Sequence, residues 1–177
     1  MYSWMNKKLQ VAKTEKYGKG VFSLQDIAAG ETLIVMGGYV IDIEAENKLD
    51  AFQIDKPIEI SEDFSFCPRV PADMDLMPQH YINHSCDPNA GFKFSNFIVA
   101  IRDIKAGEEI LYDYAMIIAS NEGSDNYFEM KCECGSEVCR GVINEEGWKE
   151  RSLQERYAGF FQGYIELKIK ESGYKTL

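Results

Sequence analysis

The sequence predicts a mainly β fold that ends in a C-terminal helical segment. Two observations support this fold class: short apolar runs of strand type recur between glycine-containing breaks, and the apolar period changes toward the C-terminus. A length of 177 residues and a hydrophobic content of 45% suit a single unit with its own core.

The predicted strands fall into two sets. The first set lies at residues 21–24, 32–36 and 39–43, and the second at residues 57–60, 96–102 and 109–114. β-branched and aromatic residues favour strands in these runs, and the Gly, Asp and Pro residues between them favour turns. We therefore expect short antiparallel strands joined by turns.

One short stretch of sequence occurs twice. Residues 26–33 (Asp-Ile-Ala-Ala-Gly-Glu-Thr-Leu) resemble residues 103–110 (Asp-Ile-Lys-Ala-Gly-Glu-Glu-Ile). The copies are too short and too far apart for a repeat architecture, whose units follow one another in series. We expect two similar turns, each with a strand on either side of its glycine.

Two segments show no clear period, residues 44–56 and residues 62–79. The second is rich in Pro, Asp and Met. Both are predicted to be ordered loops that line a site.

Near the C-terminus, apolar and aromatic residues recur mostly at three- and four-residue steps from Trp148 to Leu167, the spacing of an amphipathic helix. Gly159 and Gly163 each cost about 1 kcal/mol relative to Ala inside a helix, so we expect a break near them. The helical segment is expected to pack back on the sheets.

The net charge is -10, from 19 Lys and Arg residues against 29 Asp and Glu residues. Such a surface repels phosphate backbones and attracts basic partners, so we expect no direct nucleic-acid ligand and favour a Lys-rich peptide. An acidic surface that serves only solubility is the alternative. No stretch reaches the roughly 20 apolar residues of a membrane span, and residues 1–10 show no secretory signal. We therefore expect a soluble intracellular protein, cytoplasmic or, in a eukaryote, nuclear.

Cys132, Cys134 and Cys139 form a C-x-C-x4-C cluster. Thiolates this close together suit a tetrahedral zinc ion, which needs four ligands, with sulfur at about 2.3 Å. Cys86 and Cys67 are both candidates for the fourth position. Disulfides are the weaker alternative because the sequence gives no secretory context.

Polar residues crowd the segment 80–89, which reads His-Tyr-Ile-Asn-His-Ser-Cys-Asp-Pro-Asn. Asn83 and His84 can offer side-chain and backbone groups to a polar ligand, while Pro88 and Asn89 rigidify the turn. Taken alone, these residues fit a polar loop whose hydrogen bonds are satisfied within the protein.

Four motifs in this order resemble the SET-domain protein-lysine methyltransferases with a post-SET zinc motif. They are Gly18-Lys19-Gly20-Val21-Phe22, the Asn-His-Ser-Cys-Asp-Pro-Asn segment at 83–89, Glu109-Ile110-Leu111-Tyr112-Asp113-Tyr114, and the cysteine cluster. The resemblance spans residues 11–142. It implies a SET fold of small curved β-sheets with a pseudoknot, in which the second and third motifs thread together.

The resemblance also implies which residues form the site. The methyl donor is expected to be S-adenosyl-L-methionine, bound by Gly18, Lys19, Gly20, Asn83, His84 and Tyr114. Tyr114 is expected to be the catalytic tyrosine. Tyr112, two residues earlier, is expected to limit how many methyl groups fit, with mono- or dimethyl-lysine as the product. The zinc ligands are expected to be Cys86, Cys132, Cys134 and Cys139, with Cys67 free.

Two positions depart from the family pattern. Where many members have Tyr-x-Gly near the third strand, this chain has Met36-Gly37-Gly38-Tyr39, so the usual channel tyrosine is absent or displaced. His80 stands where an Arg often opens the Asn-His segment. Neither position is among the residues expected to bind the methyl donor or the zinc ion. Both differences therefore concern how the substrate fits.

The predicted domains are residues 1–143, a SET domain whose post-SET cluster lies at about 131–142, and residues 144–177, a helical extension packed on it. The predicted activity is transfer of methyl groups from S-adenosyl-L-methionine to a lysine side-chain amine of a protein, with a basic tail as a candidate substrate. The alternative is a non-catalytic, zinc-stapled module that binds basic peptides. The net charge argues against a nucleic-acid-binding zinc ribbon, and no motif sets the oligomeric state.

Overall fold

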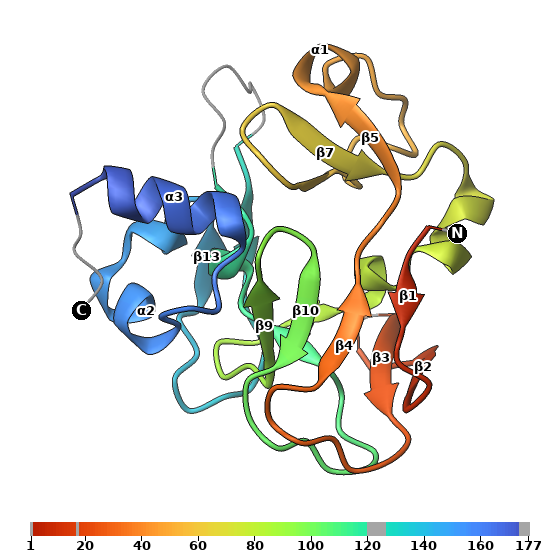
Figure 1. Cartoon of the computed structure of the whole chain (residues 1–177), viewed down its shortest axis with the longest axis vertical. Coiled ribbons are helices and arrows are strands. Elements are labelled where there is room, and N and C mark those ends of the chain that lie inside the picture. Colours follow the sequence, from red (N-terminus) through yellow and green to blue (C-terminus); the bar gives the residue numbers. More distant parts are fainter. Residues whose placement is uncertain (1, 17, 120–126, 174–177) are drawn as a thin grey trace.

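The computed structural model describes residues 2–16, 18–119 and 127–173. Within these ranges, short strands form five small sheets, and two helices of more than one turn follow them near the C-terminus (Figure 1). The predicted mainly β fold with a C-terminal helical segment is confirmed. The last part of the predicted extension, residues 174–177, lies outside the described residues.

The largest sheet has the strand order β1-β4-β10-β9, and every pair in it is antiparallel. Its strands are β1 (Trp4–Met5), β4 (Thr32–Val35), β10 (Phe97–Ala100) and β9 (Ala90–Lys93). The predicted strands at 32–36 and 96–102 are confirmed with shorter ends. Ile34, Ile98 and Phe92 are fully buried on this sheet, so it forms one wall of the core.

Two further sheets are antiparallel. β2 (Leu9–Lys13) pairs with β3 (Lys19–Ser23), and β7 (Phe64–Cys67) lies between β5 (Tyr39–Asp42) and β6 (Ile58–Glu59). The prediction of a loop at 62–79 is wrong for residues 64–67, which form β7. Within this strand, Phe66 pairs with Val40 of β5 on one side and with Ile58 of β6 on the other. That segment continues as two 3₁₀ helices, η1 (Pro71–Leu76) and η2 (Pro78–Tyr81). In the other predicted loop, a single turn of helix, α1 (Ile43–Glu46), follows β5.

The two similar turns lie against each other. Ile27 and Ile104 exchange backbone hydrogen bonds of 2.9 Å in each direction. Asp103 accepts a hydrogen bond from the backbone of Ala29, and Asp26 accepts the equivalent one from Ala106. Each turn also contains a glycine with positive φ, 86° and 89°, where a side chain would be strained. The repeated sequence therefore forms a reciprocal pair of turns.

Two short sheets bring the remaining motifs together. β8 (Asn83–His84) and β11 (Leu111–Tyr112) run parallel, with Asn83 opposite Leu111 and His84 opposite Tyr112. The chain then enters the 3₁₀ helix η3 (Tyr114–Met116). β12 (Glu129–Lys131) and β13 (Val142–Asn144) form an antiparallel pair that flanks the cysteine cluster.

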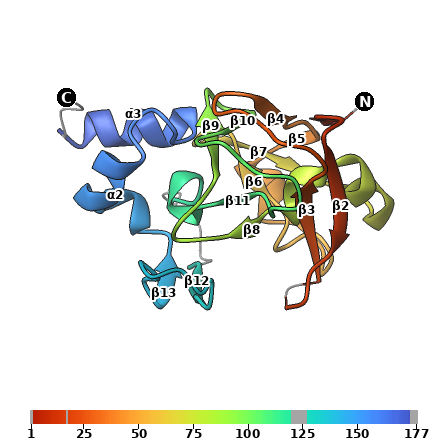
Figure 2. The same ribbon diagram turned by 90° about the horizontal axis from the view of Figure 1, so that it is seen from below.

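The helical segment has three parts: η4 (Gly147–Lys149), α2 (Arg151–Arg156) and α3 (Gly163–Glu171). The predicted break is confirmed, because α2 ends before Gly159, whose φ is +77°, and α3 begins at Gly163. Both views place α2 and α3 at the end of the molecule opposite β2 and β3 (Figures 1 and 2). The segment packs on the largest sheet, since the backbone of Phe92 in β9 donates a hydrogen bond of 2.9 Å to the Phe160 carbonyl.

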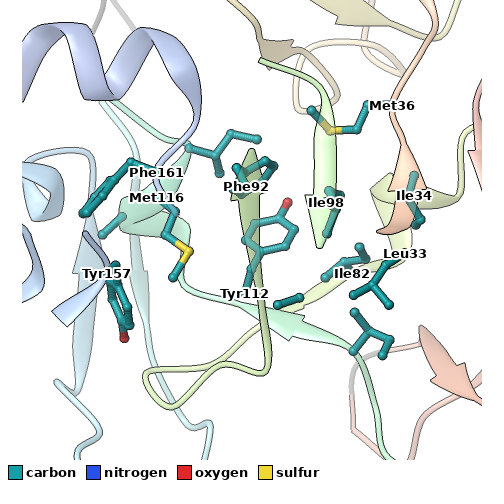
Figure 3. Close-up of a cluster of buried hydrophobic side chains, with 14 of the residues drawn as sticks. Leu33, Ile34, Met36, Ile82, Phe92, Ile98, Tyr112, Met116, Tyr157 and Phe161 are labelled. Atoms are coloured by element: carbon teal, nitrogen blue, oxygen red, sulfur yellow. The ribbon is translucent and has the colours of Figure 1, made fainter. Parts of the chain in front are cut away.

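The core joins the sheets to the helical segment. Figure 3 shows Tyr112 between strand residues such as Ile98 and helical-segment residues such as Phe161. Its ring meets that of Phe92 edge to face, with centroids 5.1 Å apart. Among the described residues, no helix has the length and apolar content needed to cross a bilayer.

Candidate functional site

Asn83 connects the first two motifs through its side-chain amide. The amide nitrogen donates to Glu109 Oε1 at 2.6 Å and to the Lys19 carbonyl at 3.2 Å. A Cβ atom on Gly20 would lie 2.4 Å from the same Glu109 oxygen, so only glycine fits there without displacing the carboxylate. The structure thus brings Lys19, Gly20 and Asn83 together around Glu109, a residue whose part in the site the sequence did not reveal.

His84 lies next to the segment Tyr112-Asp113-Tyr114. Its Nδ1 accepts a hydrogen bond of 3.2 Å from the backbone of Tyr114, and burial lowers its pKa to about 4. The neutral ring therefore carries its proton on Nε2, which lies 3.3 Å from Cys86 Sγ. His84 links the catalytic candidate Tyr114 to the cysteine cluster.

Asp113, between the two tyrosines, is fully buried. Its carboxylate accepts two hydrogen bonds from the Arg140 guanidinium, at 2.5 and 2.8 Å, and one of 3.1 Å from the Tyr157 hydroxyl. The Tyr157 hydroxyl is also 3.1 Å from the Cys86 carbonyl. A buried carboxylate needs such partners because desolvation of an unpaired charge costs several kcal/mol.

Tyr112 and Tyr114 form part of the wall of a cavity of about 510 Å³. Their ring centroids are 5.5 Å apart, and Phe128 lies 6.2 Å from Tyr114. Burial raises the pKa of Tyr114 to about 12 and raises that of Tyr112 further. Both hydroxyls stay protonated at neutral pH, so they can direct a substrate group by hydrogen bonding but cannot act as phenolate bases.

Two smaller cavities lie along the donor-binding candidates. One, of about 110 Å³, is bordered by Asn83, His84 and Tyr114 together with residues of the cysteine segment. The other, of about 350 Å³, is bordered by Lys19 and Tyr81, and the Lys19 ammonium lies 4.7 Å from the Tyr81 ring centroid. Tyr114 borders both the 110 Å³ cavity and the 510 Å³ cavity.

Four cysteine sulfur atoms lie within 4.8 Å of one another, those of Cys86, Cys132, Cys134 and Cys139. The Cys86 and Cys132 sulfurs are 3.9 Å apart. Thiolates on a tetrahedral zinc with bonds of about 2.3 Å are separated by about 3.8 Å, so this spacing fits the ion. Of the two fourth-ligand candidates, the structure brings Cys86 to the cluster. Cys67 is buried on β7, where its thiol donates to the Pro68 carbonyl.

Four acidic residues also line the large cavity: Glu46, Asp55, Glu59 and Glu145. Burial is the main cause that raises the pKa of Glu59 to about 7; a hydrogen bond from Tyr164 opposes the rise, and the nearby Glu46 and Glu145 add to it. The Asp55 carboxylate is paired with Lys56. The cavity therefore combines an aromatic wall with an excess of acidic groups, which suits a cationic side chain.

Glu59 gives a pH-dependent prediction. The folded state holds its proton more tightly than the unfolded state, so its stabilising contribution is fully present below about pH 4.5 and is lost as the pH rises to about 7. The loss amounts to at most about 3 kcal/mol. We expect the free energy of unfolding to fall less between pH 5 and pH 8 in Glu59→Gln than in the unmutated protein. Urea unfolding of both proteins at the two pH values measures this. An equal decline in both proteins would contradict the prediction.

Tyr39 and His80, at the two positions that differ from the SET-domain pattern, lie in different surroundings. The Tyr39 ring stacks under the Arg69 guanidinium, 3.4 Å from it, and lies 5.1 Å from the Tyr2 ring. Tyr39 is not among the residues that line the large cavity, whereas His80 is. The tyrosine of the Met36-Gly37-Gly38-Tyr39 segment is therefore displaced from the aromatic wall.

The comparisons with known proteins agree with this geometry. The family model described as SET domain matches residues 18–115, which are 98 of the 177 residues. The chain is 32% identical over 145 residues to Histone-lysine N-methyltransferase 2B of Homo sapiens, covering 76% of this chain and 5% of the relative. It is 32% identical over 149 residues to Histone-lysine N-methyltransferase ASHH3 of Arabidopsis thaliana, covering 76% of this chain and 38% of the relative.

A fungal relative adds a third comparison. The chain is 29% identical over 147 residues to the Cryptococcus neoformans protein named Histone-lysine N-methyltransferase, H3 lysine-4 specific, covering 78% of this chain and 10% of the relative. The chain thus matches only a minor part of each of these three relatives. Since the family model covers more than half of the chain and the motifs meet in one site, the chain belongs to the SET domain family.

Proposed function

We propose that the protein transfers methyl groups from S-adenosyl-L-methionine to the side-chain amine of a lysine in a protein substrate. The observation that carries this proposal is the position of Tyr114, which borders both the large aromatic cavity and the smaller cavity beside Asn83 and His84. A donor in one cavity and a lysine in the other would meet at this tyrosine. The relatives' names, which describe histone-lysine methyltransferases, support the same activity.

The donor site is assigned to Gly18, Lys19, Gly20, Asn83, His84 and Tyr114. Two features support the assignment: the Asn83 amide joins the Lys19 segment to β8, and each of these two residues borders a cavity. When bound, S-adenosyl-L-methionine supplies an electrophilic methyl group on a positively charged sulfur. In the transfer, a C–N bond forms as the C–S bond breaks, and the amine loses one proton.

The chain's own residues must present the lysine as a neutral amine. A free lysine has a pKa of about 10.4, and removal from water lowers it. The rings of Tyr112, Tyr114 and Phe128 line this part of the cavity and would limit the access of water to a bound amine. The Tyr114 hydroxyl would then orient the amine. Correct orientation of the reacting groups can lower the activation free energy by roughly 7–11 kcal/mol.

We assign the zinc ligands to Cys86, Cys132, Cys134 and Cys139, with a structural role for the ion. Burial raises the pKa of the Cys86 and Cys132 thiols, whereas at Cys134 burial is outweighed by hydrogen bonds from Ser136 and nearby groups, which lower the pKa, so a zinc ion would have to stabilise the thiolate form of the buried pair. A bound zinc would tie the β12–β13 segment to the loop after β8. We also propose the division into a SET domain at 1–143, including the cluster at 131–142, and an extension at 144–177, because the helical segment begins with η4 shortly after β13.

A basic protein segment, such as a histone tail, is the substrate class that we propose. The net charge of -10 and the carboxylates of Glu46, Glu59 and Glu145 in the large cavity support a cationic partner. A histone substrate implies a nuclear location, and a non-histone substrate is compatible with the cytoplasm.

The test uses two measurements on the purified protein. Calorimetry with S-adenosyl-L-methionine should detect binding at one site, and mass spectrometry with a lysine-centred peptide library should detect +14 Da products. Donor binding with no methylation of any peptide, or of recombinant histone H3, would instead support the non-catalytic binding module.

The product state gives a separate prediction. The Tyr112 ring is held by Phe92 at the cavity wall, where its hydroxyl can occupy the space that a further methyl group needs. We expect mono- or dimethyl-lysine from the unmutated protein and a higher methylation state from Tyr112→Phe, which loses one hydrogen bond worth about 0.5–1.5 kcal/mol. Intact-mass time courses on one peptide measure this, and ready accumulation of trimethyl-lysine by the unmutated protein would contradict it.

A further inference from the structure

Arg140 contacts the cysteine cluster and the third motif at the same time. It follows Cys139 directly, and its backbone N–H donates to Cys86 Sγ at 3.4 Å. Its guanidinium donates to both carboxylate oxygens of Asp113, at 2.5 and 2.8 Å. A bidentate pair of this kind fixes direction as well as distance, which a lysine ammonium cannot do.

Both oxygens of the Asp113 carboxylate accept hydrogen bonds from groups within the protein. Besides Arg140, the carboxylate accepts hydrogen bonds from the Tyr157 hydroxyl at 3.1 Å and from the backbone of Ala115 at 3.0 Å. The Asp113 side chain is fully buried, and the Arg140 side chain is 18% exposed. The ion pair is therefore well shielded from water, and small displacements of either residue leave a buried charge unpaired.

Stability alone is a weak reason for such a pair. Desolvation of two buried charges offsets most of their attraction, and well-packed apolar residues often stabilise a fold equally well. The pair adds a side-chain anchor at Asp113 to the backbone hydrogen bonds that hold Tyr112 and Tyr114 against β8. Any shift there moves both rings, and a displacement of about 1 Å near a reacting centre can cost roughly 100-fold in rate.

We propose that Arg140 is a positioning residue, which holds the Tyr112-Asp113-Tyr114 segment against the assembled cysteine cluster and so sets the aromatic wall for methyl transfer. This inference rests on the proposed function. It assigns to Arg140 an effect on the turnover step, through Asp113, rather than on binding of the donor or of the metal.

The experiment compares Arg140→Gln, Arg140→Lys, Asp113→Asn and the double variant Arg140→Gln/Asp113→Asn. Arg156→Lys is the matched control, because Arg156 contacts the Cys86 carbonyl and Asp87 but does not bond to Asp113. For each protein we measure kcat and KM with the best peptide from a lysine-centred library, donor Kd by calorimetry, zinc content by elemental analysis, and the melting temperature.

We expect Arg140→Gln and Asp113→Asn each to lower kcat by at least about tenfold, while KM, donor Kd and zinc content stay within about twofold. Arg140→Lys should lose less, because it keeps the charge and one hydrogen bond. The double variant should be no more than about threefold slower than the slower single variant, since the two residues act as a unit. Arg156→Lys should keep kcat within about twofold of the unmutated protein.

Unchanged kcat in Arg140→Gln, or a loss explained entirely by weaker donor binding or missing zinc, would overturn the proposal. If Arg140→Gln does not fold, an unchanged kcat in folded Arg140→Lys and Asp113→Asn would overturn it as well. An unmutated protein that binds no donor would refute the proposed function and this inference with it. Normal turnover of the unmutated protein together with insensitivity to Arg140 would refute only the positioning role.

Discussion

Tyr114→Phe is expected to lose most methyl transfer, by roughly 100-fold or more, because it removes the hydroxyl of the tyrosine that borders both the 510 Å³ cavity and the 110 Å³ cavity. The ring itself remains, so its contacts with His84 and Phe128 and the fold should be kept. Donor affinity should change little. Turnover of a lysine peptide and calorimetry with S-adenosyl-L-methionine measure the two quantities separately.

Asn83→Ala is the matched control for this prediction. It should show the opposite pattern, a weaker donor affinity, since it removes the amide that bridges Glu109 and the Lys19 carbonyl. If Tyr114→Phe retains near-normal turnover, the catalytic assignment is wrong. If both variants lose donor affinity to the same extent, the separation of roles between Tyr114 and Asn83 is wrong.

Cys86→Ser is expected to lose the zinc ion and to lower the melting temperature. Structural zinc sites contribute about 10–16 kcal/mol to folding, so loss of the ion is expected to cost at least about 3 kcal/mol of folding free energy. A loss of about 3 kcal/mol lowers the melting temperature of a chain of this size by roughly 6–12 °C. Elemental analysis and thermal unfolding, each with and without a chelator, provide the measurements.

Cys67→Ser is the control for the zinc prediction. Cys67 is as buried as Cys86, with 1% exposure each, but lies outside the cluster. The serine hydroxyl can replace the thiol as donor to the Pro68 carbonyl, so we expect full zinc content. Native protein without zinc, or unchanged zinc in Cys86→Ser, would show that the four cysteines do not form the proposed site.

Strands with a strong local pattern could be predicted from the sequence, and strands fixed by distant partners could not. The run at 32–36 is apolar and β-branched, so its strand was predicted within one residue. β7 was missed because it lies in a segment rich in Pro, Asp and Met, and its pairing with β5 and β6 is a tertiary property. β8 and β11 have two residues each, too few for any period to be detected.

The site shows the same division between local motifs and distant contacts. Asn83, His84, Tyr112 and Tyr114 stand in recognisable motifs, and the parallel pairing of β8 with β11 brings them together. The contacts of Asp113 could not be predicted from the residues near it in sequence. The one local signal was that Arg140 directly follows Cys139, which places a cation beside the cysteine cluster. Tyr157 stood out only as one member of an apolar stripe, and nothing local indicates that its hydroxyl reaches a buried carboxylate.

The contact between Tyr157 and Asp113 also bears on the order of events during protein synthesis. The two residues are 44 positions apart, so a ribosome that adds roughly 5–20 residues per second makes Tyr157 about 2–9 s after Asp113. During that interval the nascent chain carries both tyrosines, and for part of it the complete set of cysteines, without the hydroxyl that secures the segment between them. Maturation of the site therefore follows translation of the helical segment, and a ribosome stalled before residue 157 holds a chain whose site is incomplete.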